Sequence, residues 1–226
     1  LLSKTSDKLK QFEPNIILAS GNISVKLFQE YKIFSKIIKI GKPIQEFKTS
    51  NHIINNKPSK NLSVCILPEG ITEECVKILK FTLDCAKINT KLNFIIRFHP
   101  VTNFKKLNKK INLKQKFPKN IIFSKLSLNE DLKRCNFAIY RGSSSILTAL
   151  KNGLIPIYLE LENEIDISIV DKKYYWHLRV KNSNNLFDKI NNLTLNNDFD
   201  FKKDMLDYYN KYYTDFDYHN FLKLLN

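Results

Sequence analysis

Short apolar runs alternate with segments of helical periodicity along most of the chain. The runs are rich in Ile, Leu and Phe, which is typical of strands buried on both faces of a parallel sheet. We expect strands at residues 15–19, 36–40, 62–67, 92–96, 120–123, 137–140, 154–159 and 176–180. Between two of these runs, Cys75, Ile78, Leu79, Leu83 and Ala86 follow helical spacing, which predicts a helix that begins near Thr72.

The alternation of strands and helices predicts an α/β fold with a doubly wound parallel sheet and right-handed crossovers. The segment 15–43 reads as one β-α-β unit, and a longer series begins at residue 62. Because 44–61 lacks periodicity and is rich in Asn, Lys, Ser and Pro, we interpret it as a linker. The predicted divisions are a partial N-terminal α/β lobe at 1–43, the linker at 44–61, a Rossmann-like domain at 62–200 and C-terminal helices at 201–226.

The most specific local pattern follows the apolar run 137–140. Arg141 and Gly142 lead into Ser143, Ser144 and Ser145, and an apolar helix begins there. Glycine permits a sharp turn, and serine is favoured at helix N-termini. The unpaired N–H groups of the first turn and the three hydroxyls suit a phosphate, although the same pattern also serves as a simple helix cap.

Other polar residues follow neighbouring predicted strands. If the strand order is the common 3-2-1-4-5, the order reverses between 62–67 and 137–140, and ligands bind beyond the carboxyl ends at such a reversal. Pro68-Glu69-Gly70 follows the first of these strands, and Arg97 and His99 follow the strand beside it. We therefore expect one phosphate-sized position surrounded by Arg97, His99, Arg141, Ser143 and Ser144, with a backbone N–H from Ser145.

Each of these residues also has a structural interpretation. Arg141 is able to pair with an acid such as Asp131 or Glu160. Glu69 is able to stabilise a helix N-terminus instead of acting in catalysis. A histidine before Pro100, as His99 is, also occurs in turns. The remaining histidines have no such context, so we interpret all three as structural: His52, His177 and His219.

A strongly basic chain normally suggests nucleic acid or an anionic membrane as its partner, but the composition of this chain weakens that inference. The net charge is +15, and only four of the 37 basic residues are arginine: Arg97, Arg134, Arg141 and Arg179. A bias toward Lys, Asn and Ile is typical of an AT-rich genome, so most of the lysines are expected to be solvated surface. The stretch 103–119, with seven Lys and no acid, predicts an amphipathic helix. Its basic side is either solvated or a patch for anionic lipid or polymer.

Several other classes are not indicated. No apolar run approaches the roughly 20 residues of a membrane span, and the N-terminus lacks a signal-peptide pattern. The cysteines, Cys65, Cys75, Cys85 and Cys135, have no metal-type spacing, so we expect reduced thiols in a cytoplasmic protein and no metal.

Two motifs carry a family resemblance. Arg-Phe-His-Pro at 97–100 and Arg-Gly-Ser-Ser-Ser at 141–145 resemble the His-Pro and Ser-Ser motifs of GT-B glycosyltransferases. These enzymes build bacterial surface polysaccharides from CMP-activated donors and include sialyltransferases, polysialyltransferases and Kdo transferases. The CDP-glycerol polymerases of teichoic acid synthesis have a similar pair. The resemblance covers about 62–160, and 15–43 resembles the last β-α-β of a GT-B N-terminal domain more loosely.

The resemblance implies a function. It implies an inverting, metal-independent glycosyltransferase without a cofactor, which moves a sugar from a CMP-sialic acid-like or Kdo-like donor to a surface polysaccharide or lipid-linked glycan. By the same resemblance, His99 contacts the donor phosphate or protonates the leaving group, and Ser143 and Ser144 hold the phosphate. The enzyme would be cytoplasmic, or located at the inner face of the cytoplasmic membrane, with no specific nucleic-acid partner. Alternatives are a CDP-glycerol-type glycerophosphotransferase and a non-catalytic basic module that binds polyanions or membranes.

The catalytic base of the family usually lies on the N-terminal lobe, as an acidic pair before glycine. Pro68-Glu69-Gly70 resembles this only in part and begins the other domain. Glu69 is thus the catalytic acid or base candidate in this chain, and a base outside the chain would make it part of a larger enzyme. A GT-B fold also implies that a terminal helix crosses back, so that 205–226 contacts 1–40.

Overall fold

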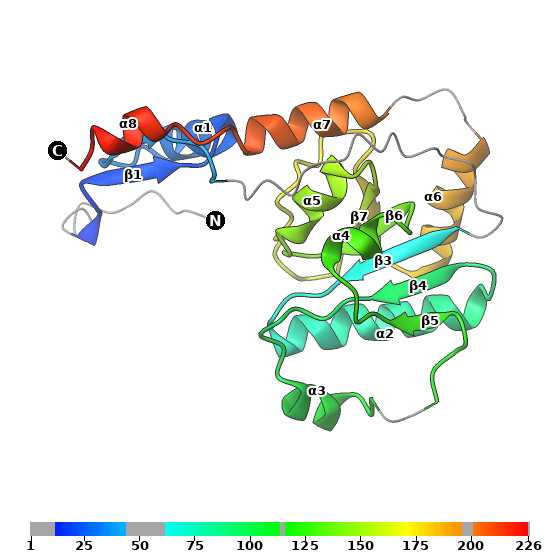
Figure 1. Ribbon diagram of the computed structural model, residues 1–226. Coiled ribbons are helices and arrows are strands. Elements are labelled where there is room, and N and C mark those ends of the chain that lie inside the picture. The colour runs from blue at the N-terminus through cyan, green and yellow to red at the C-terminus, as the bar shows by residue number, and fades with distance from the viewer. Residues whose placement is uncertain (1–11, 44–61, 114–115, 196–200, 226) are drawn as a thin grey trace. The chain divides into compact units, whose positions relative to one another are not determined.

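The computed structural model describes residues 12–43, 62–113, 116–195 and 201–225. These residues form two compact units, one made of the N-terminal residues with the chain from Leu206 onward and the other ending at Met205. The linker predicted at 44–61 lies outside the described residues. Each unit is a layered α/β arrangement (Figure 1).

The smaller unit contains a β-α-β element and the C-terminal helices. Strand β1 (Ile16–Ala19) pairs in parallel with β2 (Lys36–Lys39), and α1 (Asn22–Glu30) connects them. The C-terminal elements are α7 (Phe201–Tyr212), within which the division between the units falls, and α8 (Tyr218–Leu222).

Backbone hydrogen bonds tie the C-terminal segment to this β-α-β element. The N–H of Thr214 donates to the carbonyl of Ser20 at 2.9 Å, and the N–H of Asp217 donates to that of Ile40 at 2.8 Å. Gly41 has a φ of +79°, and a Cβ there would lie 2.0 Å from the carbonyl oxygen of Asp215. Only glycine therefore allows this close approach of two backbone segments.

The larger unit contains a six-stranded parallel sheet in the order β5-β4-β3-β6-β7-β8. Its strands are β3 (Ser63–Leu67), β4 (Asn93–Ile96), β5 (Ile121–Phe123), β6 (Phe137–Tyr140), β7 (Ile155–Leu159) and β8 (Leu178–Val180). Its helices are α2 (Thr72–Ile88), α3 (Phe104–Lys110), α4 (Leu128–Leu132), α5 (Ser145–Lys151) and α6 (Ser183–Leu195). The predicted α/β fold with a doubly wound parallel sheet is confirmed.

The central strands of the sheet are formed by apolar runs because they are buried in the core. All five residues of β3 and all four of β6 are buried, because helices cover both faces of the sheet (Figure 1). On one face, α2 contributes Ile78 and Leu79, and α6 contributes Leu186 and Ile190 to a single apolar cluster. Helix α5 packs against β6 and β7.

The amphipathic helix predicted over 103–119 is shorter than expected. Helix α3 ends at Lys110, and Ile111 is extended, with a φ of −134°. Burial of Ile111 and a 2.8 Å hydrogen bond from the N–H of Leu113 to Asn108 Oδ1 stabilise this exit. Pro118 also disfavours helical conformation at the residue before it. No helix among the described residues has the length and apolar character that a membrane crossing requires.

Candidate functional site

The site is positioned by the point at which strand order reverses. Strands β3 and β6 are neighbours, and their crossover helices run to opposite sides, which leaves a crevice at their carboxyl ends. This is the order assumed from the sequence. The loops that start there are 68–71 after β3, 97–103 after β4 and 141–144 after β6.

A hydrogen bond joins the loops after β3 and β6. Glu69 Oε1 accepts from the N–H of Gly142 at 2.7 Å. A Cβ at Gly142 would lie 2.6 Å from the same oxygen, so glycine is required for the carboxylate to reach the backbone. The carboxylate of Glu69 thus binds the first amide of the serine-rich turn, a group that the sequence pattern predicts as a phosphate ligand. This contact was not predicted.

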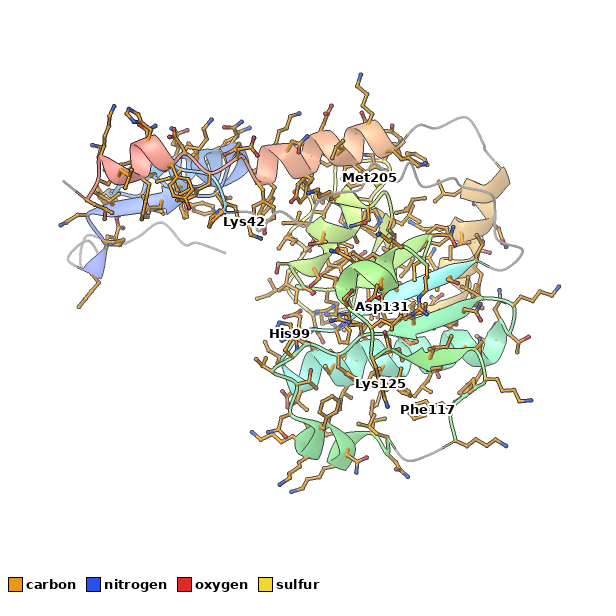
Figure 2. The ribbon with its side chains drawn as sticks, in the orientation of Figure 1. Lys42, His99, Phe117, Lys125, Asp131 and Met205 are labelled. Atoms are coloured by element: carbon orange, nitrogen blue, oxygen red, sulfur yellow. The ribbon has the colours of Figure 1, made fainter. Side chains whose placement is uncertain are left out.

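His99 lies beside the same loop and outside the core. It is exposed, and its Nδ1 accepts from the N–H of Val101 at 3.3 Å (labelled in Figure 2). A Cβ at Gly70 would lie 3.3 Å from that nitrogen, so the histidine is held close to the loop after β3. With Nδ1 as the acceptor, the proton of the neutral ring is assigned to Nε2. The structure therefore brings Glu69, Gly142 and His99 to one end of the sheet.

The three serines adopt different environments. Ser143 is buried, Ser144 is exposed and forms the N-cap of α5, and Ser145 is the first residue of that helix. The side chain of Ser144 makes no capping hydrogen bond. The exposed hydroxyl of Ser144 is accordingly not used as a cap.

Arg141 is engaged inside the protein. It is only 3% exposed, and it pairs with Glu74 at 2.5 Å and with Glu164 at 2.8 Å. A third bond runs from Nη1 to the carbonyl of Leu159 at 2.9 Å. Burial raises the pKa of Glu74, but hydrogen bonds from Lys77 and Arg141 outweigh it and the net pKa is lowered. Arg141 thus joins α2, β7 and the loop after β7. Its partners are not Asp131 or Glu160, the acids suggested by the sequence.

Arg97 is likewise paired. Its Nη1 donates to the carbonyl of Leu126 and lies 3.3 Å from Asp131 Oδ2. Asp131 is fully buried and also accepts from Ser124 at 2.6 Å and from Arg134 at 2.8 Å. A buried carboxylate requires such partners, so Arg97 fixes α4 against β4.

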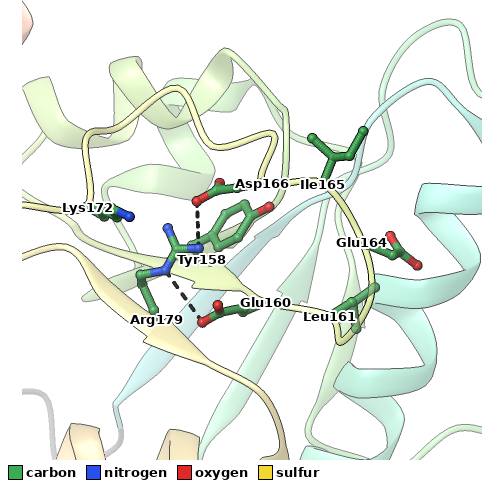
Figure 3. Close-up of a pocket in the computed structure, with 8 residues that line it drawn as sticks. All are labelled: Tyr158, Glu160, Leu161, Glu164, Ile165, Asp166, Lys172 and Arg179. Carbon is green, nitrogen blue, oxygen red and sulfur yellow. Dashed lines mark hydrogen bonds and ion pairs between the residues drawn. The ribbon is translucent and has the colours of Figure 1, made fainter. Parts of the chain in front are cut away.

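A pocket of about 280 Å³ opens beside this region, at the carboxyl ends of β7 and β8 (Figure 3). Its wall includes Tyr158, Glu160, Glu164, Asp166 and Arg179. Arg179 lies over the Tyr158 ring at 4.5 Å and pairs with Asp166 at 2.8 Å and Glu160 at 3.6 Å. Glu164 lines the pocket and also binds Arg141, so the pocket and the turn after β6 share a wall.

The sequence pattern by itself does not predict this pocket. Its acidic residues form a visible cluster at 160–166, but Arg179 is distant in sequence and only the parallel pairing of β7 with β8 brings it there. The signal available was that Arg179 is one of only four arginines. Among the described residues, no group of three His, Cys, Asp or Glu side chains is arranged to hold a metal ion.

His177 is buried close to the end of β6. Its Nε2 lies 2.9 Å from the hydroxyl of Tyr140, which in turn lies 2.7 Å from the hydroxyl of Ser168. Burial lowers the pKa of His177 to about 4, although a hydrogen bond to the carbonyl of Asp171 works in the opposite direction. His177 is therefore neutral near pH 7 and holds β6 against the loop before β8.

The fold matches solved structures of sugar-nucleotide proteins at low identity. Over 91% of this chain it is similar to Anabaena HepE in complex with UDP-glucose, with a TM-score of 0.56, 14% identity and 62% of that chain covered. Over 78% of this chain it is similar to Methanocaldococcus jannaschii UDP-GlcNAc 2-epimerase in complex with UDP-GlcNAc and UDP, with a TM-score of 0.53, 19% identity and 53% covered.

Over 92% of this chain it is also similar to the pneumococcal O-GlcNAc transferase GtfA in complex with UDP and GlcNAc, with a TM-score of 0.51, 13% identity and 44% covered. The chain has a GT-B-like fold. It spans less than two thirds of each of these structures. No protein-family model and no curated protein matches its sequence.

Proposed function

We propose that this chain is the donor-binding part of a glycosyltransferase that moves a sugar from a nucleotide donor to a cell-surface polysaccharide or lipid-linked glycan. One observation carries the proposal. In a GT-B-like fold, the loops after β3, β4 and β6 meet where strand order reverses, and they bring His99, Gly142 and the serine-rich turn to one end of the sheet.

In this proposal the donor phosphate lies at the turn after β6. Ser143 and Ser144 contribute hydroxyls, and Ser145 contributes a backbone N–H. His99 approaches from the loop after β4, and its Nε2–H donates a hydrogen bond to the leaving phosphate. Negative charge builds on the phosphate as the sugar leaves, and donors fixed in advance stabilise that charge without reorganising.

Arg97 and Arg141 take a different role from the one expected from the sequence. Because their guanidinium groups bind Asp131, Glu74 and Glu164, we assign them as positioning residues that hold the loops around the phosphate. Glu69 is assigned to the same task through Gly142. The catalytic base then belongs to the N-terminal lobe of the complete enzyme.

The pocket beside the turn suits the hydroxyl-rich part of a donor. The carboxylates of Glu160 and Asp166 accept hydrogen bonds, as two neighbouring sugar hydroxyls would require. Tyr158 and Arg179 form a flat, stacked wall there. We propose that the nucleoside occupies this pocket while its phosphates reach the serine-rich turn.

The nucleotide base is a separate choice. The His-Pro and Ser-Ser motifs resemble those of CMP-sugar enzymes, whereas the HepE, GtfA and epimerase structures contain UDP or a UDP-sugar. Both are pyrimidine nucleotides, so we propose a pyrimidine nucleotide donor. Residues 62–200 are the proposed donor domain, and the β-α-β element with the C-terminal helices is the proposed end of the N-terminal lobe.

Calorimetric titration tests the proposal. UDP, CDP and CMP are titrated separately into the chain, with ADP as a purine control and single-stranded RNA as a competitor. We expect at least one pyrimidine nucleotide to bind with one-to-one stoichiometry and to remain bound in the presence of RNA. Failure of all three to bind, together with strongly salt-dependent RNA binding, would instead support the non-catalytic basic module. Transfer from CDP-glycerol but not from nucleotide sugars would support the glycerophosphotransferase.

A further inference from the structure

Four phenylalanine rings form a continuous row along α3 and the edge strand β5. The ring centroids of Phe104 and Phe98 are 5.1 Å apart, those of Phe98 and Phe123 are 5.8 Å apart, and those of Phe123 and Phe117 are 4.9 Å apart. Phe104 is 52% exposed and Phe123 is 38% exposed. The row is thus open to solvent at two of its rings, and exposed apolar patches of this kind mark interaction sites.

Lysines surround this row. The exposed lysines of α3 and of the segment that leads to β5 are Lys105, Lys106, Lys109, Lys110, Lys116 and Lys119. Glu73 of α2 reaches one of them, Lys110, at 3.2 Å. The sequence from 97 to 129 contains no Asp or Glu, so the segment that carries the rings carries positive charge only. We call these four rings and six lysines the basic aromatic face.

The fold holds this face in place. Leu107 and Ile111 are buried in the apolar cluster with α2, which leaves the remaining side of α3 to solvent. Strand β5 is at the edge of the sheet, and Figure 2 shows Phe117 and Lys125 beside it. The face lies beside the edge strand and away from the pocket at β7 and β8.

We propose that the basic aromatic face docks on an anionic lipid bilayer. Lysines near a membrane are attracted to anionic headgroups, and exposed aromatic rings enter the interface between headgroups and acyl chains. The long lysine side chains allow the rings to insert below the headgroups while the ammonium groups remain at headgroup level. This surface is an addition to the proposed donor site, and it would bring that site to lipid-linked acceptors at the membrane.

The same residues fit a nucleic acid less well. Nucleobases stack on open ring faces and pair with arginine. Here Phe98 meets Phe104 edge to face, at 81°, Phe117 meets Phe123 at 80°, and Phe98 and Phe123 are nearly parallel, at 7°. Contacts within the row therefore already take up part of the ring surface on which a base would stack. The arginine of this segment, Arg97, is held by Asp131. RNA is therefore the competing partner in the test.

Vesicle binding of the full chain measures the electrostatic part. Vesicles of phosphatidylcholine alone are compared with vesicles that contain phosphatidylglycerol, and the test variant is Lys105→Gln with Lys109→Gln. We expect binding only to the phosphatidylglycerol vesicles, and roughly 30-fold weaker binding by the double variant, at about 5-fold per lysine. The matched control is Lys181→Gln with Lys203→Gln, which removes equal charge from exposed positions after β8 and on α7. The control should bind as the parent chain does.

Tryptophan fluorescence measures insertion of the rings. The chain has a single tryptophan, Trp176, which is fully buried, so the indole of a Phe104→Trp variant is the one that a lipid quencher reaches. Brominated phosphatidylcholine mixed with phosphatidylglycerol should quench it, whereas the parent chain should keep its fluorescence. Equal vesicle binding by the test and control lysine variants would overturn the proposal. So would an unquenched indole on bound vesicles, or displacement of the vesicles by single-stranded RNA.

Discussion

Two regions of the Rossmann-like unit differ in how their positively charged side chains are paired. In the loops at the carboxyl ends of β4 and β6, both arginines are paired with carboxylates: Arg141 with Glu74 and Glu164, and Arg97 with Asp131. On the basic aromatic face, the lysines are exposed and their segment has no acid of its own. The first arrangement determines loop positions, and the second leaves charge available to a partner.

A net charge of +15 therefore does not by itself identify a binding partner. A buried charge needs a partner with good geometry, and arginine supplies several donors in a fixed plane. Exposed lysines have no such requirement. The rare arginines therefore point to the built site, and the common lysines matter only where the fold gathers them around exposed rings.

The largest effect on stability is expected from removing the guanidinium group of Arg141. Arg141→Met leaves Glu74 and Glu164 with Lys77 as their remaining cation. Loss of one partner from a buried ion pair costs about 3–5 kcal/mol, and the remaining Lys77 places this variant at the lower end, about 3 kcal/mol. We expect a loss of that size in the free energy of unfolding, measured with urea. The control is Lys173→Met, whose pair with Asp171 is exposed and should be worth under about 1 kcal/mol. Equal losses in the two variants would contradict the contrast.

The second effect sharpens the comparison through pH. His177 has a pKa of about 4 in the folded chain because it is buried, against about 6.5 when unfolded. As pH falls below about 6.5, the unfolded state takes up the proton first. The stability contributed by the neutral, buried histidine is therefore fully present above that pH and is lost as the pH falls toward 4. The loss is on the order of 3 kcal/mol.

Urea unfolding at several pH values measures this loss. His177→Gln should flatten the curve between pH 6.5 and 4, whereas His99→Gln, at an exposed position, should keep the parent's profile. A parent chain whose stability does not change over this range would show that the buried histidine does not control it.

The third effect concerns the donor. Ser143→Ala combined with Ser144→Ala should weaken nucleotide binding by about 1–3 kcal/mol, because hydrogen bonds to a phosphate are charge-assisted. The fold should be retained, since Ser144 makes no capping bond. Ser183→Ala, at the start of α6, is the control and should bind nucleotide normally. Unchanged affinity in the double variant would remove the serine-rich turn from the site.

The smallest effect separates two roles of Glu69. Glu69→Gln keeps an acceptor for the N–H of Gly142 but removes a negative charge next to the proposed phosphate. We expect nucleotide affinity to rise about 5-fold, corresponding to roughly 1 kcal/mol of relieved repulsion. In the complete enzyme, loss of transfer with affinity retained would instead assign Glu69 to acid–base catalysis.

The sequence predicts more of the fold than of the candidate site. Local pattern suffices for a strand such as 137–140, where the predicted and observed bounds agree, because burial on both faces leaves an unbroken apolar run. The reversal between β3 and β6 also followed from the common strand order. The end of α3 was missed, because the buried Ile111 fits either a helix or an extended exit.

The site was only partly predictable for a physical reason. The convergence of loops follows from topology, but the partner of each side chain depends on residues far away in sequence. Arg141 binds Glu74 and Glu164, and Glu69 binds an amide 73 residues along the chain. The pattern around any one of them does not encode such pairs. A motif therefore indicated the candidate site, whereas the proposed division between binding and positioning residues depends on contacts that only the folded chain makes.

A crystal structure with a bound pyrimidine nucleotide tests the central claim most directly. We predict phosphate density at the turn formed by Gly142, Ser143 and Ser144, within hydrogen-bonding distance of a serine hydroxyl and facing His99. The nucleoside should lie in the pocket lined by Glu160 and Asp166. Nucleotide bound elsewhere, for example on the lysines of α3, with the carboxyl ends of β3 and β6 unoccupied, would contradict it.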